Sequence, residues 1–195
     1  MKVYMSGKDL MIEGATNENI LGGNFRNFAG LERKNQGRII VNTAGSRNFN
    51  LRIPEDQLQI FQERNCNIKM YGGNEEENES PIYFVKVNVK TDSKQPPQIY
   101  LLKANKKMQR LDPEMYYMID GMFIETCDMV MNFYRRDYND PDCKSTLYLN
   151  AMYIKQHVDP ITAKWDAMME ADDLDPNLPD ADFLDVPGQD EGAPF

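Results

Sequence analysis

The stretch IYFVKVNVK at residues 82–90 has the clearest β-strand pattern in the sequence. Its side chains alternate in character, with Tyr83, Val85, Val87 and Val89 on one face and Phe84, Lys86, Asn88 and Lys90 on the other. Successive side chains of a strand point to opposite faces, so this period of two predicts one buried face and one solvent face. The protein therefore has to cover one side of a sheet.

Strand patterns continue on both sides of this stretch at short and regular spacing. We expect further strands at residues 24–30, 37–42, 48–53, 67–72, 96–102, 128–136 and 146–155, and a short opening strand at 10–14. Short helices are predicted at 54–64, 111–120 and 159–170, where proline or aspartate marks a start. The predicted fold class is mainly β, an OB-type antiparallel barrel with additional strands and two or three short helices. Strand alternation by itself leaves an unrelated β-sandwich open.

The charge of the chain is unevenly distributed. The formal net charge is −9, and residues 170–195 contain nine acidic residues and no basic ones, so that residues 1–169 carry 22 of each sign. A neutral body with a polyanionic end differs from a uniformly acidic protein. We therefore expect a folded domain at 1–169 and a disordered acidic C-terminal tail at 170–195.

Cysteine usage and the distribution of apolar residues indicate the cellular compartment. The 195 residues suit one domain, and the three cysteines, Cys66, Cys127 and Cys143, show no paired spacing. This usage favours a reducing environment. No apolar run approaches the roughly 18 residues that a membrane span needs, and residues 1–14 lack the apolar core of a signal peptide. We expect a cytoplasmic protein.

Candidate catalytic residues are few. The single histidine, His157, ends a predicted strand, where a surface or capping role is typical, and the cysteines lack metal-ligand spacing. We expect no catalytic residue, no metal and no cofactor. A metal-dependent nuclease that uses loop carboxylates such as Asp140 and Asp142 is kept as an alternative.

Three predicted strands each place an aromatic residue beside a basic one on the face that should meet solvent. The pairs are Arg26 with Phe28, Lys69 with Tyr71, and Phe84 with Lys86 and Lys90. Unpaired nucleic-acid bases stack on aromatic rings while their phosphates need cations, so this combination suits a single strand. Basic loops at strand ends add Arg33, Lys34, Lys103, Lys106 and Lys107, where an OB barrel binds its ligand. Core packing of the aromatics and protection of a sheet edge by the lysines are the alternative explanations.

An ordered set of motifs resembles the OB-fold single-stranded DNA-binding proteins of tailed bacteriophages. The motifs are NFRNFAG (24–30), GSRNFNLRIPEDQLQIF (45–61), NIKM (67–70), IYFVKVNV (82–89), PPQIYLL (96–102), LDPEMYYMID (111–120) and YLNAMYIK (148–155). The resemblance covers roughly residues 24–158 and implies DNA contacts by Arg26, Phe28, Arg38, Arg47 and Lys69. Tryptophan stacking is not carried over from the family, because RNCNIK (64–69) and NFYRRDYN (132–139) depart from its pattern and the one tryptophan, Trp165, lies in the last predicted helix.

The end of the tail also fits this resemblance. Bacterial and many phage single-strand binders end in an acidic segment whose tip recruits replication and repair enzymes, and here Asp190 and Glu191 precede Pro194 and Phe195. We therefore predict a sequence-tolerant single-stranded DNA-binding protein that coats DNA during phage replication or recombination. Its tail would bind partner enzymes through Asp190, Glu191, Pro194 and Phe195. An RNA-binding OB module remains the other alternative, since stacking does not distinguish the two sugars.

Overall fold

The computed structural model describes residues 1–22, 25–35, 39–72, 80–102, 108–161, 164, 165 and 168. The chain divides into two compact units, Met1–His157 and Val158–Phe195. In the second unit, the backbone N–H of Ile161 donates to Asp159 Oδ1 at 3.0 Å, which is the N-cap expected for that helix. No helix in the described ranges is long and apolar enough to cross a membrane.

The first unit is mainly β. Its strands are β1 (Lys2–Ser6), β2 (Asp9–Ala15), β3 (Arg26–Asn27), β4 (Arg33–Asn35), β5 (Ile39–Asn42), β6 (Asn48–Ile53), β7 (Lys69–Tyr71), β8 (Ile82–Asn88), β9 (Gln98–Leu102), β10 (Met108–Leu111), β11 (Ile124–Tyr134) and β12 (Thr146–Gln156). Its short helices are η2 (Glu55–Gln57), α1 (Leu58–Glu63) and η4 (Pro113–Gly121). The predicted mainly β class with a few short helices is confirmed.

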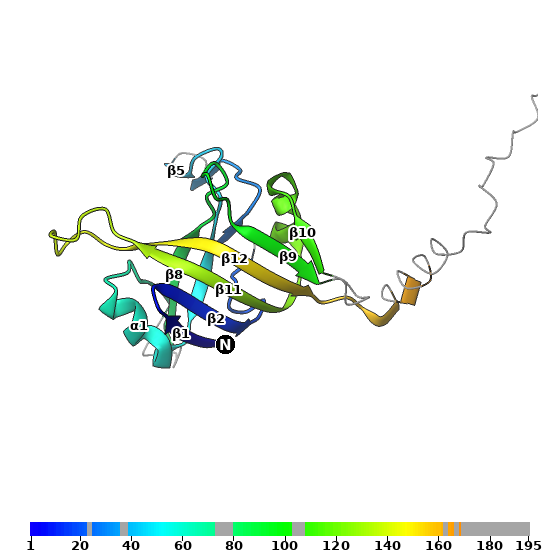
Figure 1. The fold of residues 1–195 in the computed structure, drawn as a ribbon, viewed down its shortest axis with the longest axis horizontal. Coiled ribbons are helices and arrows are strands. Elements are labelled where there is room, and N and C mark those ends of the chain that lie inside the picture. Colours follow the sequence, from blue (N-terminus) through cyan, green and yellow to red (C-terminus); the bar gives the residue numbers. More distant parts are fainter. Residues whose placement is uncertain are drawn as a thin grey trace, which may run out of the picture. The chain divides into compact units, whose positions relative to one another are not determined.

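The strands of the main sheet follow one hydrogen-bonded order. The hydrogen-bonded path runs β1-β2-β11-β12-β8-β6-β3, while β4 and β5 form a separate hairpin. Neighbours along this path are antiparallel except β8 and β12, which are parallel. The long strands β11 and β12 cross the middle of the sheet, with β2 beside β11 and β9 beside β12 (Figure 1).

The path of the described strands is open, and the segment that follows β2 narrows the opening. Ile20 forms an antiparallel bridge with Leu51 of β6. The N–H of Leu21 donates to the Asn50 carbonyl at 3.1 Å, and the N–H of Arg52 donates to the Asn19 carbonyl at 2.7 Å. One continuous segment therefore contacts β11 through β2 and then reaches the far edge of β6.

The predicted alternation in β8 is confirmed from Val85 onward, whereas Phe84, expected on the solvent face, is buried and Tyr83 is half-buried. Val85, Val87 and Val89 are buried, whereas Lys86 and Asn88 on the opposite face are half-buried. The same rule holds in β6, where Phe49 and Leu51 are fully buried. The outer faces of these two adjacent strands, which pair in register from Asn48 opposite Asn88, form one polar surface.

A buried arginine joins the opening of the sheet to η4. Arg26 is only 1% exposed. Its Nη1 donates to the carbonyls of Ile119 (3.0 Å) and Met122 (2.7 Å). Its Nη2 donates to the Ile20 carbonyl (2.6 Å) and to Asn17 Oδ1 (3.0 Å). Burial lowers the pKa of this guanidinium, and the nearby Asp120 carboxylate opposes that shift.

Several element boundaries differ from the prediction. Residues 2–15 form the whole β1–β2 hairpin, with Val3, Leu10 and Ile12 in the core, although only a short strand at 10–14 was expected. The predicted strand at 24–30 shortens to β3, because both Asp120 carboxylate oxygens bind the N–H groups of Phe28 and Ala29 at 2.7 and 2.9 Å. Strands β4 and β10 lie in segments that were predicted as basic loops.

The Arg26 network should dominate stability. Replacing Arg26 by Ala leaves three buried carbonyls and one amide oxygen without their donor, so we expect the free energy of unfolding to fall by at least about 3 kcal/mol. Urea unfolding followed by far-ultraviolet circular dichroism measures this. The control is Arg52→Ala, at an exposed position of β6, with a change within about 0.5 kcal/mol. Equal midpoints for the two variants would contradict the role of Arg26.

Candidate nucleic-acid interface

A groove with a volume of about 330 Å³ lies on the outer face of β6 and β8, beside the β4–β5 hairpin. Four cationic side chains line it: Arg33, Lys34, Lys69 and Lys86. The remaining lining residues are apolar or carry amides, namely Phe25, Val41, Asn27, Asn42, Asn48 and Asn50. None of the described residues that line the groove is acidic, so its chemistry suits a polyanion with flat apolar parts.

A network of asparagine amides holds the hairpin against the sheet. Asn27 donates to the Leu31 carbonyl at 2.9 Å and accepts the Leu31 N–H at 2.9 Å. Asn42 donates to the carbonyls of Leu31 (3.0 Å) and Ser46 (2.8 Å). Asn48 of β6 donates to Asn42 Oδ1 at 2.6 Å. These bonds connect both ends of the hairpin to the strand that lies beneath the groove.

The two lysines on the sheet side act together. Lys86 is half-buried, and its pKa is lowered first by burial and second by the positive charge of Lys69. A phosphate that reaches this point meets both ammonium groups and relieves their repulsion. Both lysines also line a smaller pocket with Asn88 and Thr146. The groove therefore continues from β6 across β8 to the start of β12.

The hairpin cations are anchored in different ways. The Arg33 guanidinium donates from Nη2 to the Arg26 carbonyl at 2.5 Å, which ties the hairpin to β3. Lys34 pairs with Glu32 at 3.1 Å, and both side chains are exposed. An exposed pair of this kind is worth little, so Lys34 can exchange its partner for a phosphate at small cost.

Comparison with known proteins identifies the family. A family model described as "phage ssDNA-binding domain" matches residues 2–192. The chain belongs to this family. No curated protein sequence matches it.

Two solved structures of one phage protein are similar to the chain. The first is the single-stranded DNA-binding protein from bacteriophage Enc34 in complex with ssDNA, at 9% identity and a TM-score of 0.43, covering 78% of this chain and 89% of that one. The second is a C-terminal truncation of the same protein, at 9% identity and a TM-score of 0.42, covering 78% and 88%.

Two predicted DNA contacts of this phage ssDNA-binding domain are wrong. Arg26 is occupied by the buried network described above, and Phe28 is fully buried, stacked on Phe49 with ring centroids 5.3 Å apart. The two residues do share one face, as alternation predicted, but that face is the core. The opposite face carries Phe25 and Asn27, and both line the groove. The assignment of faces at β3 was therefore inverted.

The other two aromatic residues predicted to stack on bases, Phe84 and Tyr71, do not offer a ring face in the groove. Phe84 is 9% exposed and meets Phe25 edge to face, with centroids 6.1 Å apart, so it supports Phe25 and does not offer a free ring face. Stacking of a base directly on Phe84 was thus also wrong. Tyr71 is 69% exposed at the end of β7 and does not line the groove.

The predicted cations divide into three sets. Arg33, Lys34, Lys69 and Lys86 are brought together in the groove. Arg47 instead donates to Thr91 Oγ1 at 2.7 Å, and Lys90 lines a different pocket. The remaining candidates lie outside the described residues: Arg38, Lys103, Lys106 and Lys107, and in the tail Asp190, Glu191, Pro194 and Phe195.

Sequence reasoning missed Phe25 and the asparagines of the groove. A signal existed for Asn48 and Asn50, since they alternate with the core residues Phe49 and Leu51 and so belong to the outer face. Phe25 and Asn42 gave no such signal, because their place in the groove depends on how the hairpin folds onto the sheet.

The phenylalanine pair Phe25 and Phe28 separates surface from core. Phe28→Ala should lower the free energy of unfolding by about 3–5 kcal/mol, because it empties a fully buried site. Phe25→Ala should cost no more than about 1.5 kcal/mol, since the ring is 43% exposed and loses mainly its edge contact with Phe84. Thermal and urea unfolding of both variants measure the difference. A larger loss for Phe25 would contradict this placement.

Proposed function

We propose that the β6–β8 groove is the surface on which this phage ssDNA-binding domain holds single-stranded DNA during replication or recombination. The observation that carries the proposal is the gathering of four cations and a half-exposed phenylalanine in one groove whose described lining contains no acid. Cations neutralise the backbone, and Phe25 provides a ring on which a base can stack.

Sequence tolerance follows from how the groove amides are used. The amides of Asn27, Asn42 and Asn48 already bond to one another or to backbone carbonyls. They shape the groove and have little capacity left to recognise the edges of bases. Stacking accepts every base because each has a π-face. Affinity should therefore depend on backbone charge and stacking more than on sequence.

Salt dependence tests the groove. Four phosphate contacts predict that log affinity falls against log salt with a slope of about −3 for single-stranded DNA. Lys69→Gln and Lys86→Gln should each remove one contact and make this slope shallower by about 0.7. Phe25→Ala should weaken binding by about 1–3 kcal/mol with little change in slope. Fluorescence anisotropy with labelled oligo-dT over a salt series measures all of these.

The matched control is Lys155→Gln. Lys155 lies near the end of β12 and pairs with Glu125, outside the groove. It should keep the wild-type slope. Wild-type slopes for both Lys69→Gln and Lys86→Gln would place the phosphates elsewhere. Competition with a matched RNA oligomer tests the RNA alternative, which requires equal or tighter RNA binding.

We assign binding and no catalytic step to this surface. Burial raises the pKa of the Cys66 thiol to about 12 and also raises that of Cys127, so neither thiol supplies a nucleophile near neutral pH. The loop carboxylates Asp137 and Asp140 accept the backbone N–H groups of Asn139 and Asp142, which gives them a local structural role. DNA binding of this kind is expected in the cytoplasm of the host cell, where phage DNA is copied.

The acidic residues 170–195 suit recruitment of replication or recombination proteins, with Asp190, Glu191, Pro194 and Phe195 as the contact. The segment holds nine acids and no bases, so it is also a polyanion joined to a cationic groove. It should therefore compete with DNA phosphates, most strongly in dilute buffer because screening shortens to about 8 Å at physiological salt.

Two truncations separate these roles of the tail. A chain that ends at Met169 should bind oligo-dT more tightly than the full chain at low salt, and the gain should shrink as salt rises. A chain that lacks only Pro194 and Phe195 should keep full-length affinity and lose the partner proteins recovered from phage-infected cells. Equal affinity of the full chain and the Met169 truncation at low salt contradicts competition. Equal recovery of partners with and without Pro194 and Phe195 contradicts recruitment.

A further inference from the structure

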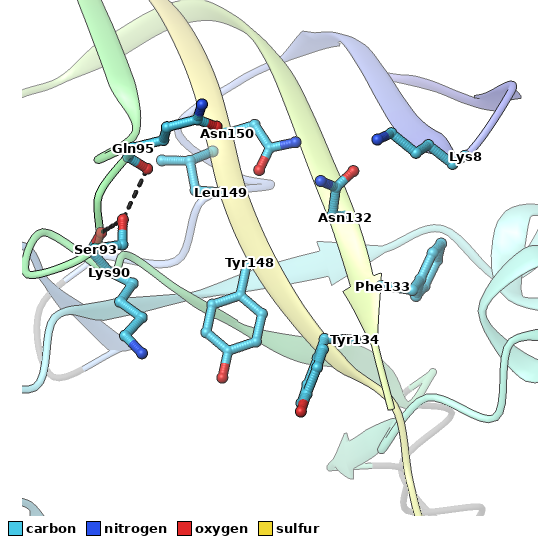
Figure 2. Close-up of a pocket in the computed structure, with 10 residues that line it drawn as sticks. All are labelled: Lys8, Lys90, Ser93, Gln95, Asn132, Phe133, Tyr134, Tyr148, Leu149 and Asn150. Carbon is cyan, nitrogen blue, oxygen red and sulfur yellow. Dashed lines mark hydrogen bonds between the residues drawn. The ribbon is translucent and has the colours of Figure 1, made fainter. Parts of the chain in front are cut away.

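A second and larger pocket lies away from the groove cations. Its volume is about 610 Å³, and its walls come from the β1–β2 turn, the segment between β8 and β9, and the facing parts of β11 and β12. Figure 2 shows Tyr134 and Tyr148 projecting side by side from the two neighbouring strands, with the Lys90 side chain on the same side as Tyr148. Neither tyrosine lines the β6–β8 groove.

The two tyrosines form an open aromatic corner. Their ring centroids are 6.1 Å apart with planes at 78°, and Tyr134 is 55% exposed. A flat group that enters the corner can stack on one ring and meet the edge of the other. Tyr148 lies opposite Asn132 in the strand register, and Tyr134 lies opposite Thr146, so polar groups adjoin both rings.

Cations and amides complete the lining. Lys8 and Lys90 approach from two different loops, and Gln95, Asn132 and Asn150 add amides. The Ser93 hydroxyl donates to the Gln95 carbonyl at 2.7 Å and lies 3.3 Å from the Lys90 carbonyl, which holds together the loop that carries Lys90. None of the ten described lining residues is acidic. The nearby Asp9 carboxylate accepts from Asn132 in the amide orientation that satisfies both groups.

The pocket is continuous with the groove across the outer face of the sheet. In the strand registers Asn48 lies opposite Asn88, Asn88 opposite Tyr148, and Tyr148 opposite Asn132. Adjacent strands are about 4.8 Å apart, so β11 lies roughly 10 Å from β8 along this row. A strand of DNA that leaves Lys86 can therefore cross Asn88 and Thr146, which line the connecting pocket, and reach the tyrosines.

We propose that the Tyr134–Tyr148 pocket is a second base-binding subsite for the same DNA strand. A base stacks in the aromatic corner, and Lys8 and Lys90 hold the flanking phosphates. This proposal rests on the proposed role of the β6–β8 groove as the first contact. It assigns to the outer face of β11 and β12 a part in DNA binding that extends the site across the sheet.

Oligonucleotide length tests the proposal on the full-length protein at physiological salt. Labelled oligo-dT of about 4 nucleotides fits the groove alone, and one of about 16 nucleotides reaches both sites. The double variant Tyr134→Ala, Tyr148→Ala should lose about tenfold in affinity for the long oligomer and less than twofold for the short one. Replacing both residues by Phe should preserve binding, because the rings remain.

Two further variants complete the test. Tyr153→Ala, at an exposed tyrosine of β12 that stacks on Tyr100 outside the pocket, should bind both lengths as wild type does. Lys90→Gln changes an exposed side chain and should leave the fold intact. The slope of log affinity against log salt should become shallower by about 0.7 for the long oligomer only. Thermal unfolding checks that each variant is folded.

The outcomes separate this inference from the groove proposal. Unchanged long-oligomer affinity in the double Ala variant, or equal losses on both lengths, overturns the second subsite. An unchanged salt slope for Lys90→Gln on the long oligomer also overturns it. The double variant Lys69→Gln, Lys86→Gln should weaken both lengths. If it binds the short oligomer normally while the tyrosine variant still loses the long one, the groove proposal fails and the tyrosine pocket stands as a DNA site by itself.

Discussion

The buried guanidinium of Arg26 is the contact on which the arrangement of the β6–β8 groove depends. Through four hydrogen bonds it joins the segment after β2 to the end of η4. Asp120, next to Ile119 in η4, binds the N–H groups of Phe28 and Ala29. The cost of burying a charge is met because nearly all of its donors are used, with Nε the exception. Without this network neither the opening of the sheet nor the direction of the chain into the β4–β5 hairpin would be fixed.

The β4–β5 hairpin forms one wall of the β6–β8 groove. Because Arg26 and Phe28 point into the core, Phe25 lies on the exposed side, and the buried Asn27 and the other asparagines then hold the hairpin beside β6. Arg33 and Lys34 come from the hairpin, while Lys69 and Lys86 come from the sheet. The positive charge of the groove thus comes from the hairpin and from the sheet, which are separate in the sequence and adjacent in the fold.

The outer face of the main sheet joins the groove to the aromatic pocket. Four strands contribute to it, β6, β8, β12 and β11, and their registers align polar residues into rows. The parallel pairing of β8 with β12 is what brings Tyr148 next to Asn88. A surface of this kind suits a long polyanion better than a compact ligand, since charge and aromatic rings recur along it and no enclosed cavity is required.

The sequence by itself determined the class of the fold and one side of the site. Alternation in β6 and β8 depends only on local pattern, so the buried valines, the outward lysine Lys86 and the mainly β architecture could be predicted. Lys69 also lines the groove, but alternation did not decide its place, because all three residues of β7 are exposed and Tyr71 lies outside the groove. The short helices were predictable from their proline and aspartate starts.

Only the tertiary structure decided which face of β3 packs into the core and which faces the groove. Alternation states that Arg26 and Phe28 share a face, but it cannot say which face meets the core when a two-residue strand carries an arginine. That choice came from four acceptors of the Arg26 guanidinium. Two belong to Asn17 and Ile20, and two are the carbonyls of Ile119 and Met122, which lie 93 and 96 positions away from Arg26 in the sequence. The positions of Phe25, Asn42 and Tyr134 were also decided by tertiary structure: Phe25 meets Phe84 of β8, Asn42 accepts from Asn48 of β6, and Tyr134 lies opposite Thr146 of β12.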